Sequence, residues 1–207
     1  MKYPNTYVVY DLETTGKEPS EDEAIEIGAL KVQDGKIVDS KSWLLKPSVP
    51  INPEAAAVHG LTQEYVDANG RDRHECWEEF VDFVGLNYLV QPWPIIGHNI
   101  VRFDNLFVAR AIKFMGFDLD HAEFIDTAGI YKGRKLGLVQ GETETHYDYA
   151  KRVLDTKAYG LKYRLTSVYE ELGGSSEGLQ AHRAEADVLM TNYVYRKMAE
   201  LDQEIPT

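Results

Sequence analysis

Five acidic and imidazole side chains stand where apolar runs of this sequence end or where a helical pattern begins. They are Asp11, Glu13, Asp104, His182 and Asp187. Carboxylates at the ends of core elements cost free energy unless a cation pairs with them. A pair of divalent metal ions would supply that charge, and a histidine, which titrates near neutral pH, can accept a proton from water. The set therefore predicts metal-dependent hydrolysis of phosphodiesters.

The first pair follows the apolar run YVVY, and its members are two residues apart. On a strand, Asp11 and Glu13 would point to the same face and could present oxygens to one hard cation. Alone, such a pair is more often a polar strand end followed by a turn. The metal-binding interpretation of this pair is favoured only because two other segments carry residues of the same kind.

The second segment, GHNIVRFD, begins on another apolar run. Asp104 falls at the expected start of a helix, where the helix dipole favours a negative charge. His98 and Asn99 directly follow a buried strand, a usual place for ligand contacts in α/β sheets. The plainer explanations are a carboxylate in a first helical turn and ordinary loop polarity.

The third segment, HRAEAD, opens the last helical pattern. His182 lies at the expected helix start, and Asp187 falls on the face that carries the apolar Met190 and Val194, so it should point inward. Glu185 should face solvent. For one His–Asp pair without context, a solvated helix start would be the commoner explanation.

The elements that must position these residues follow from the apolar periodicity. We expect strands at 7–10, 24–32, 37–45, 94–99 and 124–126, and helices at 53–59, 76–86, 103–115, 161–172 and 184–201. Three strands joined by hairpin-like links, then strands alternating with helices, favour a mixed sheet flanked by helices. Between 130 and 158 the pattern fails, which predicts an insertion: a long loop with a helical turn around 147–154.

The insertion and the residues after it are basic and aromatic. The residues concerned are Tyr131, Lys132, Arg134, Lys135, Tyr147, Tyr149, Lys151, Arg152, Lys157, Tyr159 and Tyr163. Such a mixture suits a flap that grips a single strand of nucleic acid. A loop that packs on its own domain is at least as good an explanation.

Length, cysteine content and charge bound the class of protein. With 207 residues we expect a single domain, 1–207, that includes the insertion. A lone cysteine, Cys76, excludes an intrachain disulfide. The sequence shows no signal-peptide pattern and no apolar run of ~20 residues. We therefore expect a cytoplasmic protein with no membrane partner. A net charge of −12 argues against a sequence-independent duplex binder, but an enzyme that grips only a chain end needs no basic face.

The three segments, in this order, resemble the three motifs of the DnaQ-like exonuclease family, in its DEDDh group, within the ribonuclease-H-like superfamily. The motifs are DLETTG, GHNIVRFD and HRAEAD, and INPEAAAVHGLTQE resembles the family's link segment. The resemblance runs from residue 7 to about 198. It implies a ribonuclease-H-like mixed five-stranded sheet flanked by helices, and 3′-to-5′ exonuclease action that releases nucleoside 5′-monophosphates from single-stranded or frayed ends.

The resemblance also implies a role for each catalytic residue. Asp11 would bridge two Mg²⁺ or Mn²⁺ ions. Glu13 and Asp187 would complete the site of the ion that holds the attacking water. Asp104 would orient water around the other ion, and His182 would take the proton from the nucleophilic water.

Contacts to the chain end are less closely defined by the resemblance. The candidates are Leu12, Thr14, Thr15, Leu61, His98, Asn99 and Phe103. The backbone of the first motif would meet the terminal nucleotide, with one of the two threonines near its 3′-hydroxyl. Leu61 and Phe103 could wedge between terminal bases, and core packing explains these two equally well.

Several alternatives stay open at this point. DNA ends of the proofreading or repair type are favoured, and an RNA-trimming exoribonuclease is the alternative. The chain contains no polymerase domain and its LDQEIPT tail offers no extended tether, so a freestanding enzyme is preferred, with a homodimer or a polymerase partner open. More remote readings are a non-catalytic module that kept the fold and a calcium-stabilised structural domain.

Overall fold

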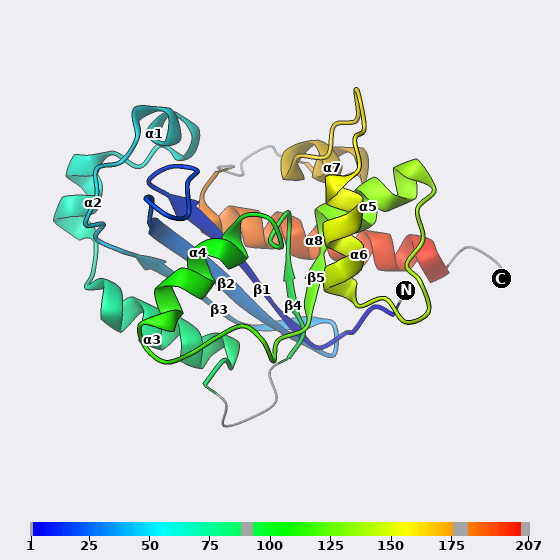
Figure 1. Cartoon of the computed structure of the whole chain (residues 1–207), viewed down its shortest axis with the longest axis horizontal. Coiled ribbons are helices and arrows are strands. Elements are labelled where there is room, and N and C mark those ends of the chain that lie inside the picture. The colour runs from blue at the N-terminus through cyan, green and yellow to red at the C-terminus, as the bar shows by residue number, and fades with distance from the viewer. Residues whose placement is uncertain (1, 88–92, 176–181, 204–207) are drawn as a thin grey trace.

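A computed structural model describes residues 2–87, 93–175 and 182–203 (Figure 1). The described strands form one five-stranded sheet in the order β3-β2-β1-β4-β5. Their bounds are β1 Tyr7–Thr14, β2 Ala24–Gln33, β3 Lys36–Leu44, β4 Ile95–Gly97 and β5 Phe124–Asp126. The helices are α1 Pro53–His59, α2 Gln63–Asn69, α3 Arg73–Val84, α4 Asp104–Lys113, α5 Thr127–Leu136, α6 His146–Asp155, α7 Leu165–Glu171 and α8 Ala184–Gln203.

The central strand, β1, is antiparallel to β2 and parallel to β4, and β4 is parallel to β5. The carboxyl ends of these three parallel strands therefore meet at one edge of the sheet. Helices cover both faces: α3, α4 and α6 lie in front of the sheet in Figure 1, and α8 crosses behind it. The expected mixed five-stranded sheet flanked by helices is confirmed.

Alternation along β1 assigns its side chains to the two faces. Val8 and Tyr10 belong to the apolar core shared with α3 and α4. Tyr7 and Val9 belong to the core shared with α7 and α8. By the same alternation, Asp11 and Glu13 lie on the α8 side at the end of the strand.

The prediction of a long loop between 130 and 158 is wrong, because α5 and α6 account for most of this segment. The helical turn expected around 147–154 is confirmed as part of α6. Gly129 and Gly133 weaken the helical signal in the sequence. In the fold these glycines let α6 pack closely: a Cβ on Gly129 would lie 3.1 Å from the Ala150 Cβ, and one on Gly133 would overlap the Tyr149 ring and hydroxyl. Close packing between α5 and α6 thus stabilises α5 despite the low helical propensity of its glycines.

Most of the basic and aromatic residues of this segment pack on their own domain. Tyr131, Lys132 and Tyr149 are buried. Arg134 pairs with Asp202, Lys135 with Glu171 and Arg152 with Glu144. These side chains therefore do not form a free flap.

Several element boundaries differ from expectation, and three of these differences bear on the site. β1 extends to residue 14 rather than 10, because its last residues continue the pairing with β2. β4 ends at Gly97, because Asn99 takes a left-handed conformation with φ 64°. Residues 161–164 precede α7 rather than belonging to it. The last four residues of the LDQEIPT tail lie outside the described ranges, and no helix within those ranges is long and apolar enough to cross a membrane.

Candidate active site

The three motif segments converge at the carboxyl end of β1. Ligand atoms of Glu13, His182 and Asp187 all lie within 4.8 Å of one another. The Asp104 carboxylate accepts the backbone N–H of Leu12 at 3.0 Å, which places it against the strand that carries the first motif. The fold thus gathers, at one edge of the sheet, residues as far apart in sequence as Glu13 and Asp187.

The start of α4 is held by a buried carboxylate at the end of the neighbouring strand. Asp126 of β5 accepts the backbone N–H of Asn99 at 3.0 Å and of Val101 at 3.1 Å. This fixes the turn that leads into Asp104, a residue only 4% exposed. Next to it, the Tyr10 hydroxyl donates to the side-chain carbonyl of Asn105 at 2.5 Å and ties α4 to β1.

The start of α8 is held by β2. Glu26, which pairs in register with Glu13, accepts two hydrogen bonds from the Arg183 guanidinium and one from the Ala184 backbone N–H at 2.9 Å. Two residues further along β2, Gly28 leaves room for the same helix start. A Cβ there would overlap the Ala184 carbonyl oxygen and lie 2.5 Å from its carbon.

His182 lies just before α8, at the rim of the site. Its φ of 63° places its backbone in the left-handed region, and its side chain is exposed. Its backbone N–H points at the Asp187 carboxylate, 3.4 Å away. Glu185 is exposed, as expected from the sequence.

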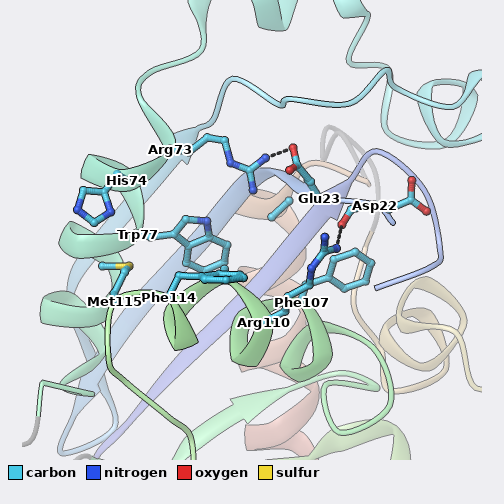
Figure 2. Close-up of a pocket in the computed structure, with 11 residues that line it drawn as sticks. Asp22, Glu23, Arg73, His74, Trp77, Phe107, Arg110, Phe114 and Met115 are labelled. Atoms are coloured by element: carbon cyan, nitrogen blue, oxygen red, sulfur yellow. Dashed lines mark hydrogen bonds and ion pairs between the residues drawn. The ribbon is translucent and has the colours of Figure 1, made fainter. Parts of the chain in front are cut away.

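The loop after the first motif is fixed by two arginines that line a separate pocket between α3 and α4 (Figure 2). Arg73 pairs with Glu23, and Arg110 donates to the carbonyls of Pro19 at 2.6 Å and Asp22 at 3.1 Å. The Asp22 carboxylate in turn accepts the hydroxyl of Thr15 at 3.1 Å. None of the five predicted catalytic residues lines this pocket. The two arginines that line it hold the backbone beyond Glu13 in place.

Burial and mutual repulsion raise the pKa of each carboxyl in the cluster. Loss of solvent is the largest cause in every case. It raises the pKa of Glu13 to about 8, of Asp104 to about 7 and of Asp187 to about 6, and that of Asp11 well above its usual range. The neighbouring carboxylates add to the shift of Asp11 and Glu13.

This donor set fits divalent metal ions. Four carboxyl groups crowd together here, and each has a raised pKa because its ionised form is disfavoured without a bound cation. Oxygen donors of this kind are the ligands preferred by Mg²⁺ and Mn²⁺. Asp11, Glu13, Asp104 and Asp187 would hold the ions, and His182 stands at the rim beside them.

The candidate substrate contacts fall into two groups. Leu12, Thr14 and Thr15 are buried, and the Thr14 hydroxyl donates to the Gly16 carbonyl at 2.6 Å. Leu61 is 2% exposed in an apolar cluster with Ile25, Ile51 and Val66, so core packing accounts for it.

The other candidates border the cluster from the α4 side. Phe103 is half-buried, its ring 5.0 Å from that of Phe107, and packs partly against the core. Asn99 is half-buried and lines a cleft together with His98, His182 and Asp187. Both ring nitrogens of His98 already have protein partners at 2.8 Å.

Three residues that support the site were not identified from the sequence. Glu26, Gly28 and Asp126 position the helix starts near Asp187 and Asp104. A glycine inside a strand is a recognised sign of close backbone approach, so Gly28 carried a usable signal. The two carboxylates carried none, because their partners come from segments distant in sequence.

Comparisons with known proteins agree with this geometry. A family model described as "Exonuclease" (RNase_T) matches residues 8–195. The chain is 35% identical over 201 residues to the PolC-type DNA polymerase III of Thermotoga petrophila and 38% identical over 184 residues to that of Clostridium perfringens, covering 97% and 82% of this chain. It spans 12% of the length of each of these relatives.

Solved structures show the same fold. E. coli exonuclease I in complex with a dA16 oligonucleotide superimposes with a TM-score of 0.72 at 20% identity, over 97% of this chain and 42% of that one. A product-bound structure of exonuclease I gives a TM-score of 0.70 at 19% identity, over 95% and 43% of the two chains. The resemblance to the DnaQ-like group is confirmed by the family match over most of the chain, and the chain belongs to the exonuclease family.

Proposed function

We propose that this chain, as one exonuclease domain, is a metal-dependent 3′-to-5′ exonuclease that removes nucleoside 5′-monophosphates from single-stranded or frayed DNA ends. The observation that carries the proposal is the convergence of four buried or half-buried carboxylates and His182 at one end of β1. Unneutralised buried carboxylates destabilise a fold, so their presence favours a catalytic site over a non-catalytic module.

The residues divide the work between holding ions and moving a proton. Divalent ions held by Asp11, Glu13, Asp104 and Asp187 would stabilise negative charge on the attacking and leaving oxygens. His182 is exposed and next to Asp187, so its imidazole can reach a water outside the cluster and accept its proton. The backbone contact to Asp187 holds the base at the rim instead of in the core.

DNA is the substrate that the relatives favour. The PolC-type proteins are named as DNA polymerases, and exonuclease I was solved with DNA oligonucleotides. Ends made during DNA synthesis are therefore the substrate we propose, with a polymerase as the partner. The single buried cysteine fits a reducing compartment such as the cytoplasm.

The test uses 5′-labelled DNA and RNA oligonucleotides of one sequence, incubated with Mg²⁺ or with EDTA. Variant His182→Ala removes the base, and His74→Ala, on the exposed face of α3, is the matched control. We expect a ladder that shortens from the 3′ end of DNA, needs metal, persists in the control and is lost in His182→Ala. Faster shortening of RNA would contradict the choice of DNA, and a folded protein that shortens neither would contradict the proposed function.

A further inference from the structure

A short strap, residues 161–164, runs from the end of the α6 region to the start of α7 and forms one wall of the cleft at the active site. The cleft measures about 780 Å³. Lys162 and Arg164 line it on the strap side, and His182 and Asp187 line it on the side of the metal-ligand cluster. The strap and the metal-ligand cluster therefore border the same cleft.

The strap has an inward and an outward side. Leu161, Tyr163 and Leu165 are half-buried and pack against the core of α7 and α8. Lys162 and Arg164 lie between them in sequence and are exposed. Extended backbone turns alternate residues to opposite sides, so the two cations share the outward side.

The strap is anchored at its centre. The Nε2 atom of His98 lies 2.8 Å from the Tyr163 carbonyl oxygen, and its Nδ1 atom lies 2.8 Å from the Thr127 hydroxyl. A carbonyl only accepts, so the imidazole donates to it. The Lys132 ammonium lies 4.9 Å from the centre of the Tyr163 ring. The backbone between the two cations is therefore held in place.

The charges of the two strap cations are free for a ligand. Within the described ranges, neither Lys162 nor Arg164 has an ion pair or hydrogen bond with another side chain. Other arginines are engaged: Arg73 with Glu23, Arg152 with Glu144 and Arg183 with Glu26. On a chain of net charge −12, these two cations both border the active-site cleft.

We propose that Lys162 and Arg164 bind the phosphodiester backbone of the substrate strand, on the 5′ side of its terminal nucleotide. This inference rests on the proposed function. The cluster repels a polyanion except where ions bind the reacting phosphate, so the preceding phosphates need cations supplied by the protein. The strap supplies two without reading bases, as a nonspecific exonuclease requires.

The experiment compares two substrates. One is a single-stranded oligonucleotide, which reaches the strap, and the other is the p-nitrophenyl ester of thymidine 5′-monophosphate, which is too short to do so. The variant is Lys162→Gln with Arg164→Gln. The matched control is Lys36→Gln with Lys113→Gln, which removes the same charge from exposed positions at the β2–β3 hairpin and at the far end of α4.

We expect the strap variant to raise KM for the oligonucleotide about tenfold, because two exposed charge contacts together have about that strength. The slope of log KM against log salt should fall by about 1.4, since each single-strand phosphate contact contributes about 0.7. The strap variant should hydrolyse the ester at the wild-type rate and melt at the wild-type temperature. The control variant should match the wild type in all of these measurements.

Two results would overturn the inference. An unchanged KM and salt slope for the oligonucleotide would show that the strap does not hold the backbone. An equal loss on the ester would show that the substitutions damage the site itself. If the wild type hydrolyses neither substrate, both the proposed function and the strap inference fail. If the wild type is active, the comparison with the strap variant tests the strap inference alone.

Discussion

Gly28 should control catalysis although it cannot contact substrate through a side chain. The substitution Gly28→Ala places a Cβ 2.5 Å from the Ala184 carbonyl carbon and 2.9 Å from the Glu185 backbone nitrogen. Ordinary contacts of a Cβ begin near 3.4 Å, so the start of α8 must move by about 1 Å away from β2. Because Asp187 lies in the first turn of α8, that shift separates it from Glu13.

Two effects of different size follow. Overpacking of this kind costs about 1–3 kcal/mol, which for a chain of this length lowers the melting temperature by roughly 2–12 °C. A misplacement of about 1 Å in a catalytic constellation can reduce the rate about 100-fold. The loss of activity should therefore be far larger than the loss of stability explains at temperatures where the variant is folded.

The assay measures kcat on the p-nitrophenyl ester with Mn²⁺, together with calorimetric melting. The matched control is Gly141→Ala, whose Cβ would meet the Glu144 Cβ at an ordinary 3.5 Å. We expect the control to behave as wild type. A Gly28→Ala protein with the rate and melting temperature of the control would refute the idea that β2 sets the position of α8.

Three further predictions concern charge. Asp187→Asn should abolish activity yet melt higher than wild type in EDTA at pH 8, because it removes a carboxylate whose burial raises its pKa to about 6; an active variant would contradict the metal-ligand role. The pKa values of Glu13 (about 8) and Asp104 (about 7) exceed their unfolded values, so the metal-free fold binds more protons than the unfolded chain. The melting temperature of the metal-free protein should therefore fall from about pH 5 to 8.5, while the rise in melting temperature caused by Mn²⁺ should grow over the same range. A rise caused by Mn²⁺ that does not depend on pH would contradict this. Glu26→Gln should lower the melting temperature by roughly 2–8 °C, because the charge-assisted bonds from Arg183 contribute about 1–2 kcal/mol; calorimetry that finds no change would show that this pair does not hold α8.

The proposed catalytic side chains could be predicted from the sequence because their types and order are distinctive. Asp11 and Glu13 follow the clear apolar run YVVY within β1, and the helix that carries Asp187 has a clear apolar face. The order of the five strands also follows from periodicity. Each of these signals is local, so it can be recognised in the sequence without knowledge of the fold.

The supporting residues could not be identified in the same way, because their roles depend on contacts between distant segments. Glu26 becomes the anchor of α8 only when a helix 158 residues later docks on β2. The helix α5 was missed because its Gly129 and Gly133 lower helical propensity, while the packing that needs those glycines appears only in three dimensions. His98 looked like a ligand contact, yet both its ring nitrogens serve the strap and α5.

The most direct test of the central claim, that the carboxylate cluster is a two-metal catalytic site, is a calorimetric titration with Mn²⁺ in the presence of a nucleoside 5′-monophosphate. The wild type should bind two ions per chain, and Asp11→Asn, which removes the carboxylate proposed to bridge them, should lose this binding together with all hydrolysis. A wild type that hydrolyses DNA without binding metal, or an Asp11→Asn protein that binds two ions and stays active, would contradict the claim.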